Sequence, residues 1–263
     1  MMCTSGCIKF GEFVLHADQV AGKSVLEVGS YNVNGSLRSV ASRFGPREYV
    51  GVDLILCNHV ASPCTATPCV DRVCDAANLL AEFGSDRFDV VISTELLEHA
   101  KDWRKAIHNL KGVLKPGGSL VLTTRSPGFF RHDYPSDYWR FTYHDMKAIF
   151  SDLVVEHLQD DPAQPGIFVS GKKPYDFREN DLSCYDVFSM ATPEFFYYIA
   201  ARNQGVPAME KGFAVRCFRI PEDAMDLCRT LNQVVGWGLF GVVEAKYAND
   251  TSYNAKFLTT DRQ

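Results

Sequence analysis

Acidic side chains and a glycine turn lie near the ends of three apolar segments in the first third of the chain. Glu27 and Gly29 belong to SVLEVG, Asp53 ends EYVGVD, and Asp75 ends VDRVCD. A glycine at the end of a strand lets the backbone turn sharply and approach a ligand closely. A carboxylate at a strand end can accept hydrogen bonds from both hydroxyls of an adenosine ribose. The pattern therefore indicates a site for an adenosine-containing ligand.

Two kinds of cofactor use such a glycine turn, namely dinucleotides and S-adenosylmethionine. The dinucleotide pattern GxGxxG is absent here, because the turn reads GSYNVNG. A carboxylate at Glu27 is unfavourable beside a pyrophosphate but suits a ligand whose amino-acid end carries an ammonium. Glu27 could instead pair with a basic residue in the core, and Asp53 and Asp75 could instead cap a turn or a helix.

Candidate bases follow two later apolar segments. Glu95 and His99 come after FDVVIST and would share one face if residues 95–100 formed a helix. In the stretch 125–141, we expect His132 to act as a general base with Asp133 as its orienting carboxylate. His99 is the second candidate base, although it could equally cap or brace a helix.

The stretch 125–141 is long for a connection and rich in aromatic residues, and such loops at the ligand end of a sheet are usually functional. We expect Arg125, Tyr134, Tyr138 and Trp139 to bind the substrate. The alternative is a structural role, in which DYWRF packs as an aromatic cluster and Arg140 forms an ion pair.

Strand-like and helix-like segments alternate from about residue 24 to residue 173. The expected strands are 24–29, 48–53, 70–75, 87–94, 119–125, 153–159 and 167–171, and the expected helices are about 6–20, 35–43, 76–83, 102–114 and 143–150. This alternation predicts an α/β fold with a parallel sheet covered on both faces. Ligands bind at the carboxyl ends of such strands, so the residues above would share one edge.

Five segments in this order resemble a class I S-adenosylmethionine-dependent methyltransferase of the broad type-11 kind. They are VLEVGSYNVNGS, YVGVDL, VCDA, FDVVISTELLEH and LKPGGSLVLTT. The resemblance implies a doubly wound, seven-stranded, mostly parallel sheet, the Rossmann-like methyltransferase fold, in the order 3-2-1-4-5-7-6 with strand 7 antiparallel. It also implies S-adenosylmethionine as the cofactor and S-adenosylhomocysteine as the product.

The same resemblance assigns roles to the cofactor-binding residues. They are Glu27, Gly29, Ser30, Tyr31 and Gly35 at the methionine end, Asp53 and Leu54 at the ribose, Asp75 and Ala76 at the adenine, and Thr94 and Glu95 near the sulfonium. The turn departs from the commoner family pattern, since Tyr31 and Val33 occupy positions that are often glycine. Asn32, Asn34 and Gly35 would supply the turn instead.

The pattern changes after residue 174. We expect a cofactor-binding domain at 1–174 and an α+β appendage or extension at 175–263, with helices at 193–202 and 221–235 and strands at 213–220, 237–247 and 255–260. An aromatic group at 195–198 suggests that a homo-oligomer forms through this region.

Composition limits the partners. The chain has 263 residues, a net charge of −5 and no dense Lys/Arg stripe, which disfavours nucleic acid and favours a small-molecule acceptor. No apolar run approaches the ~18 residues that span a bilayer, so no membrane partner is expected. Nine cysteines without a signal-peptide core indicate reduced thiols and a cytoplasmic location. Cysteine and histidine residues crowd positions 57–74, but their spacings exceed those of zinc sites, and no metal is predicted.

Together these observations predict an S-adenosylmethionine-dependent methyltransferase that methylates a small molecule, on oxygen and with the help of a general base. A nicotinamide-dependent oxidoreductase is the first alternative, and the missing GxGxxG disfavours it. The second alternative is a non-catalytic assembly module that keeps the cofactor pocket.

Overall fold

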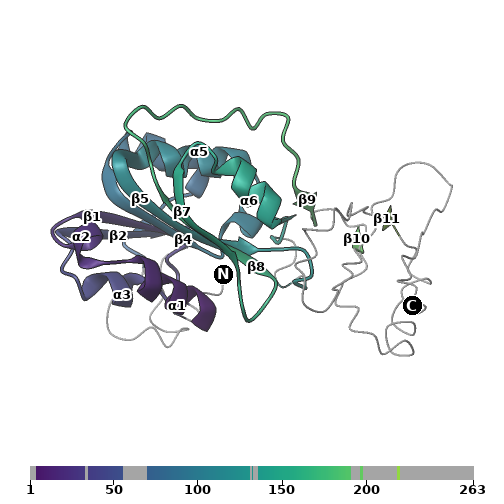
Figure 1. Cartoon of the computed structure of the whole chain (residues 1–263), viewed down its shortest axis with the longest axis horizontal. Helices are drawn as coiled ribbons and strands as arrows, with labels where there is room; N and C mark the ends of the chain where they lie inside the picture. Colours follow the sequence, from purple (N-terminus) through teal and green to yellow (C-terminus); the bar gives the residue numbers. More distant parts are fainter. Residues whose placement is uncertain are drawn as a thin grey trace.

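One twisted sheet with helices on both faces forms the main part of the described structure (Figure 1). The computed structural model describes residues 4–32, 35–55, 70–130, 132 and 136–190, and the backbone of 196–197 and 218–219. Within these ranges, no helix combines the length and apolarity needed to cross a membrane.

The sheet has seven strands in the order β3-β2-β1-β4-β5-β8-β7. Their bounds are Ser24–Val28 (β1), Glu48–Asp53 (β2), Arg72–Val73 (β3), Phe88–Thr94 (β4), Leu114–Arg125 (β5), Val154–Asp160 (β7) and Gly166–Lys172 (β8). Strand β8 runs antiparallel to both β5 and β7, and the other neighbours are parallel. Counted along the chain, the order is 3-2-1-4-5-7-6, and the predicted fold is confirmed.

Two further strand pairs lie outside the main sheet. Strand β6 (Trp139–Arg140) pairs with β9 (Phe188–Ser189), and β10 (Phe196–Tyr197) pairs with β11 (Phe218–Arg219).

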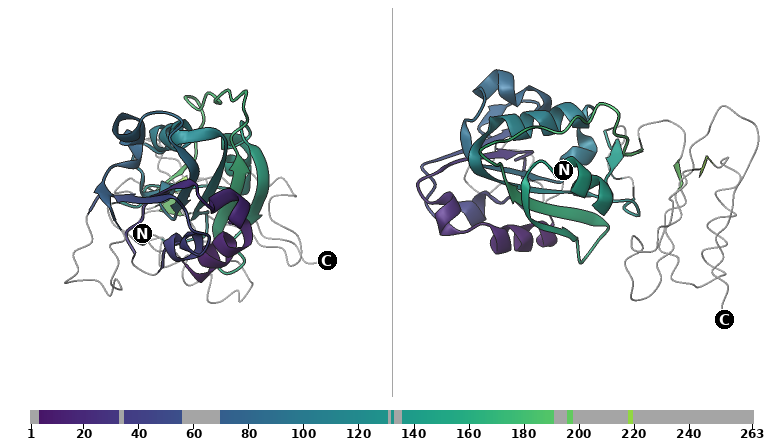
Figure 2. Two further views of the ribbon diagram at one scale, coloured as in Figure 1. Left: turned by 90° about the vertical axis from the view of Figure 1, so that its left-hand side faces the viewer. Right: turned by 45° about the horizontal axis from the view of Figure 1, so that its top comes forward.

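The helices form two layers, one on each face of the sheet, and Figure 2 shows these layers from two further directions. One layer holds α1 (Ser5–Val14), α2 (Ala17–Val20) and α3 (Arg38–Ser42), and the other holds η1 (Ala76–Asn78), α4 (Leu79–Phe83), η2 (Leu97–His99), α5 (Trp103–Val113) and α6 (Tyr143–Ile149). The side chains of successive β1 residues point to opposite layers. Val25 packs in the core beneath α1, α2 and α3, and Leu26 packs in the core beneath α5 and α6. Burial on both faces explains why the strands read as continuous apolar runs.

Local signals set the ends of the two longest helices on the second face. The side chain of Asp102 accepts a hydrogen bond from the backbone of Lys105 at the start of α5. Thr142 and Asp145 form a reciprocal capping box at the start of α6. The sequence KPGG (115–118) follows the end of α5, and β5 begins before it, because Leu114 already pairs with Phe88 of β4.

Several predicted elements have different bounds. The single helix expected at 6–20 is two helices, because Leu15 is extended and ends α1. Helix 35–43 shortens to α3, strand 70–75 shortens to β3, and helix 76–83 divides into η1 and α4. The helix expected at 193–202 is wrong at Phe196–Tyr197, which form a strand. Strand 213–220 agrees with β11, and the elements expected at 221–235, 237–247 and 255–260 lie outside the described residues.

The segment 175–190 packs on the main domain rather than leaving it. It passes over α5 and α6 before β9 (Figure 1). Leu182 joins the core, and Arg104 of α5 donates a hydrogen bond of 2.8 Å to its carbonyl oxygen. Where an appendage begins beyond this segment stays a prediction.

Candidate functional site

The carboxyl ends of the central strands bring the predicted site residues to one edge of the sheet. Strands β1, β2, β4 and β5 are parallel and end at Val28, Asp53, Thr94 and Arg125. The turn between β7 and β8, residues 161–165, joins the same edge, because Arg125 pairs with Gly166. This is the edge at which parallel α/β sheets bind ligands.

The turn after β1 has the backbone geometry that the sequence predicted. Gly29 has a φ of +82°, a conformation that disfavours residues with a side chain. Its neighbour Ser30 is buried, and the Ser30 hydroxyl has no hydrogen-bond partner among the described residues. Gly35 donates a backbone hydrogen bond of 2.8 Å to Asn32, so an asparagine does help to close the turn. Val33 and Asn34 lie outside the described residues.

Glu27 fastens this turn to the start of α3. Its buried carboxylate accepts hydrogen bonds from the Ser36 hydroxyl at 2.8 and 3.0 Å, from the Leu37 backbone at 3.1 Å and from the Tyr49 hydroxyl at 2.9 Å. Burial raises the pKa of Glu27, and the hydrogen bonds from Ser36 and Tyr49 oppose that rise. The carboxylate therefore positions the loop, and its contact with a ligand ammonium stays a prediction.

Asp53 lies beside the turn at the end of β2. Its carboxylate accepts hydrogen bonds from the backbone of Tyr31 at 3.0 Å and of Leu54 at 2.7 Å. The side chain is buried, and burial raises its pKa despite these two hydrogen bonds. A carboxylate offers about four lone-pair positions, so two remain for the hydroxyls of a ribose.

Asp75 has the capping role that was its alternative interpretation. Its side chain accepts a hydrogen bond of 2.8 Å from the backbone of Ala77 at the start of η1. Ala76 is buried beside it. A contact of Asp75 and Ala76 with adenine is compatible with this cap and stays a prediction.

The residues after β4 depart from the expected helix. Glu95 has a φ of +53°, which is uncommon for a residue with a side chain, and only Leu97–His99 form a 3₁₀ turn. Residues 95–100 therefore do not form the helix that would have given Glu95 and His99 a common face. The Glu95 backbone donates hydrogen bonds to the carbonyl (3.0 Å) and hydroxyl (3.2 Å) oxygens of Thr123 on β5. These hydrogen bonds from the neighbouring strand hold the unusual backbone in place.

The Glu95 side chain points into a buried polar cluster with Arg125. The two form an ion pair, and the Cys7 thiol of α1 lies 3.6 Å from Glu95 Oε1. Burial raises the pKa of Glu95 well above its usual range, and the neighbouring Glu98 carboxylate raises it further. Arg125 also lies 3.4 Å from Asp161 and places its guanidinium 4.2 Å from the centre of the Phe129 ring.

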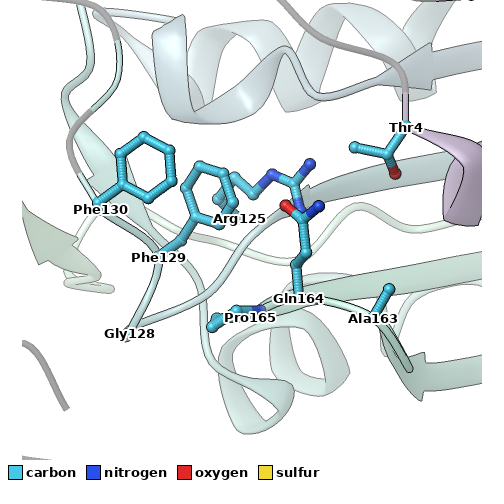
Figure 3. Close-up of a pocket in the computed structure, with 8 residues that line it drawn as sticks. All are labelled: Thr4, Arg125, Gly128, Phe129, Phe130, Ala163, Gln164 and Pro165. Atoms are coloured by element: carbon cyan, nitrogen blue, oxygen red, sulfur yellow. The ribbon is translucent and has the colours of Figure 1, made fainter. Parts of the chain in front are cut away.

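A cavity of about 420 Å³ opens against this cluster. Figure 3 shows the Arg125 guanidinium with the rings of Phe129 and Phe130 on one side. Thr4, at the start of α1, lies on the other side. The lining residues are Thr4, Arg125, Gly128, Phe129, Phe130, Ala163, Gln164 and Pro165. The rings of Phe129 and Phe130 are stacked, with centroids 4.7 Å apart.

Of the predicted substrate-binding residues that the structure describes, Arg125 lines this cavity, and Tyr138 and Trp139 do not. The Trp139 indole instead donates a hydrogen bond of 2.8 Å to the carbonyl of Ala100, and the Tyr138 backbone donates one of 2.7 Å to the carbonyl of Glu98. Tyr134 lies outside the described residues. The other residues of this loop that line the cavity, Gly128, Phe129 and Phe130, were not among the predicted substrate-binding residues.

Two histidines meet next to this cavity. The Nε2 atoms of His99 and His132 are 3.0 Å apart, although the residues lie on different loops. Nδ1 of His99 lies 2.7 Å from the carbonyl oxygen of Ser136. Nδ1 of His132 lies 3.0 Å from Oδ2 of Asp137, which is close enough for an ion pair although the two groups are not aligned for a regular hydrogen bond.

The acid beside His132 is therefore Asp137, whereas Asp133 was expected there and lies outside the described residues. Arg140 pairs with both carboxylate oxygens of Asp137, and these contacts hold the pKa of Asp137 far below its usual range. The ion pair that was the structural alternative for Arg140 is present. It supports the functional arrangement, because it fixes the carboxylate that faces His132.

Comparison with known proteins identifies the family. A family model described as a methyltransferase domain matches residues 6–160, which is more than half of the chain. The chain belongs to this family. The predicted resemblance to class I S-adenosylmethionine-dependent methyltransferases and the predicted cofactor are confirmed.

Two curated relatives carry O-methyltransferase names. The ubiquinone biosynthesis O-methyltransferase of Idiomarina loihiensis is 32% identical over 120 residues, which are 44% of this chain and 48% of that protein. The mitochondrial ubiquinone biosynthesis O-methyltransferase of Homo sapiens is 32% identical over 110 residues, which are 39% of this chain and 29% of that protein. The chain thus spans half or less of the length of these relatives.

A solved structure with a similar fold is the Burkholderia thailandensis 1,6-didemethyltoxoflavin-N1-methyltransferase, which contains S-adenosylhomocysteine. It aligns with a TM-score of 0.47 at 18% identity, over 65% of this chain and 79% of that chain.

Proposed function

We propose that the chain transfers a methyl group from S-adenosylmethionine to an oxygen atom of a small-molecule acceptor. The observation that carries this proposal is the cavity beside Arg125, which opens at the edge of the sheet where Gly29 and Asp53 also lie. Membership of the methyltransferase-domain family supports the donor. The names of the two curated relatives support oxygen as the accepting atom.

The residues at the edge of the sheet fit the donor. The positive φ of Gly29 leaves room for close approach, and the buried hydroxyl of Ser30 lacks a partner within the described chain. Asp53 would hold the ribose, Asp75 and Ala76 the adenine, and Glu27 the turn around the methionine end. Thr94, buried at the end of β4, would lie near the sulfonium.

The donor supplies a methyl group on positively charged sulfur, so the O–CH₃ bond forms as the S–CH₃ bond breaks and the sulfur leaves as a neutral thioether. The chain's main task is to align acceptor and donor, and such alignment contributes at best about 7–11 kcal/mol. The acceptor hydroxyl must also lose its proton. His99 and His132 would promote that loss, a contribution on the order of 10²–10⁴-fold.

The charges around the cavity favour a neutral, planar acceptor. Arg125 already faces two carboxylates, Glu95 and Asp161, so its positive charge is not available to a carboxylate on the acceptor. The stacked rings of Phe129 and Phe130 offer an aromatic wall. The volume is within the range of about 300–1,000 Å³ that small-molecule sites have. A phenol fits these features better than a small organic acid.

Two measurements test the proposal. Calorimetry should show binding of S-adenosylmethionine and no binding of NADH. Transfer of labelled methyl groups to a panel of acceptors should favour phenols over aliphatic carboxylic acids of similar size. Binding of NADH instead of the donor would support an oxidoreductase, and donor binding without transfer to any acceptor would support a non-catalytic module.

A further inference from the structure

We infer that Glu98, His99 and His132 form a binding site for a divalent transition-metal cation beside the acceptor cavity. One carboxylate oxygen and one nitrogen of each imidazole lie within 4.8 Å of one another. Binding of the cation does not depend on the proposed function, but its role in activating the acceptor hydroxyl does.

The contacts of the two imidazoles favour hydrogen on Nδ1 of each ring. The carbonyl oxygen of Ser136 can only accept, so Nδ1 of His99 must be the donor across their 2.7 Å. Nδ1 of His132 lies 3.0 Å from a carboxylate oxygen of Asp137, and a lone pair there would be repelled. With hydrogen on Nδ1, each ring presents the lone pair of Nε2, and these two lone pairs face each other across 3.0 Å. With hydrogen on Nδ1 of both rings, a positive charge between the two Nε2 atoms stabilises this arrangement.

Glu98 indicates that this charge is a metal ion rather than a shared proton. Its side chain is fully buried, and Thr124 donates a hydrogen bond of 2.9 Å to Oε2. Oε1 accepts no hydrogen bond within the described chain, and it lies 3.9 Å from Nε2 of His99. A proton between the imidazoles would leave this buried oxygen unsatisfied, which is costly. A cation at the centre of the three atoms satisfies all of them.

The distances and ligand types suit zinc and neighbouring transition metals. Ligand atoms bonded at about 2.1 Å are about 3.0 Å apart at right angles and about 3.4 Å apart in a tetrahedron. Small side-chain movements would bring the three atoms into this range. Two imidazoles and one carboxylate favour transition metals over magnesium or calcium, which prefer oxygen ligands.

The surroundings resemble the second layer of contacts that metal-binding histidines usually have. Nδ1 of each imidazole lies within 3.0 Å of an oxygen atom, and Arg140 holds the Asp137 carboxylate in turn. Three protein ligands leave a coordination position open for a substrate oxygen. The rings of Phe129 and Phe130, which line the cavity, lie with centroids 5.3 and 6.3 Å from that of His132.

A cation here would change how the acceptor hydroxyl is activated. It would bind the hydroxyl oxygen, lower the pKa of that hydroxyl and hold the oxygen towards the methyl group. The proton would pass to solvent, the O–CH₃ bond would form as the S–CH₃ bond breaks, and the metal would be neither oxidised nor reduced. His99 and His132 would then act as ligands instead of as the base.

The test is a titration of the chelator-treated full chain with Co²⁺ and with Zn²⁺, followed by visible absorption and calorimetry. We expect one site with nitrogen and oxygen ligation in the wild type. Glu98→Gln and His132→Gln should each weaken binding at least tenfold, and Asp137→Asn should weaken it about 10- to 100-fold by freeing the His132 ring. His108→Gln is the matched control, because His108 also pairs with a carboxylate, Glu179, at 2.7 Å but lies away from the cluster.

Three results would overturn the inference. They are the absence of Co²⁺ binding in the wild type, unchanged affinity in both Glu98→Gln and His132→Gln, and a thiolate charge-transfer band, which would place the metal on the cysteines. Circular dichroism of each variant confirms that it is folded. Donor binding, measured by calorimetry without metal, separates failure of this site from failure of the proposed function.

Discussion

Replacement of Asp53 by asparagine tests how the donor is bound. Asp53→Asn keeps the size of the side chain and removes its charge. The carboxylate accepts backbone hydrogen bonds from Tyr31 and Leu54, and an amide oxygen can retain one of them. Burial already raises the pKa of Asp53, so the neutral amide avoids the cost of burying a charge. We therefore expect a change in the free energy of unfolding of no more than about 1 kcal/mol.

The affinity for the donor should change far more. A hydrogen bond to a charged group contributes about 1.5–3 kcal/mol, and one between neutral groups about 0.5–1.5 kcal/mol. The two hydrogen bonds from the ribose hydroxyls to residue 53 would therefore contribute roughly 2–3 kcal/mol less binding free energy in the variant. Since about 1.4 kcal/mol is tenfold in affinity, the Kd for S-adenosylmethionine should rise roughly 30- to 150-fold.

Calorimetric titration of wild type and variant with S-adenosylmethionine measures this change, and thermal unfolding checks stability. Asp89→Asn is the matched control, because the Asp89 carboxylate binds the backbone and hydroxyl of Ser24 at the start of β1, at the opposite edge of the sheet. Its Kd should stay within about twofold of wild type. A Kd for Asp53→Asn that is also within twofold of wild type would refute the assignment of the ribose to Asp53.

Three further predictions concern stability, turnover and the acceptor. Hydrogen bonds from Ser24 and the charge of Lys115 lower the pKa of Asp89 to about 2, so its stabilising effect is present above pH 4 and is lost as the pH falls towards 2. With allowance for solvent screening, Asp89→Asn should lower the free energy of unfolding by about 1–2 kcal/mol at pH 6 and by almost nothing at pH 2. Urea denaturation at the two pH values measures this difference. An equal loss at both would contradict the role of the Asp89 charge. His132→Ala should lower kcat at least tenfold and leave the donor Kd nearly unchanged, because His132 lies in the cluster beside the cavity; a kcat within twofold of wild type would exclude its participation. Phe130→Ala should raise KM for an aromatic acceptor roughly 2- to 12-fold, the equivalent of about 0.5–1.5 kcal/mol for an aromatic contact. Stability should not fall, because the Phe130 ring is 61% exposed. An unchanged KM would show that the acceptor binds elsewhere.

The location of the site residues at the ends of strands could be predicted from the sequence. Asp53 and Gly29 follow apolar runs that are buried on both faces, and the parallel sheet brings such ends to one edge. The order of the strands followed from the resemblance to class I S-adenosylmethionine-dependent methyltransferases.

The relation between Glu95 and His99 was not predictable from spacing. Hydrogen bonds from the Glu95 backbone to Thr123, on a neighbouring strand, hold Glu95 in a left-handed conformation and prevent a regular helix. Helical periodicity assumes that local contacts decide the backbone, and here contacts 28 residues away decide it.

Partners that the fold brings from a distance also escaped prediction. Asp137, held by Arg140, lies beside His132, whereas Asp133, the predicted partner, lies outside the described residues. Cys7 meets Glu95 although they lie 88 residues apart. For the proposed cation site, the sequence does hold one signal, the pair Glu98-His99. A carboxylate next to a histidine after a buried strand can supply two metal ligands.

A crystal structure of the chain with S-adenosylhomocysteine would show whether the donor lies at the carboxyl edge of the sheet. We predict that both ribose hydroxyls lie about 2.5–3.0 Å from the carboxylate of Asp53, with the thioether directed towards the cavity that Arg125 lines. A product molecule bound away from the carboxyl edge of the sheet, or an Asp53 side chain turned away from the ribose, would contradict it.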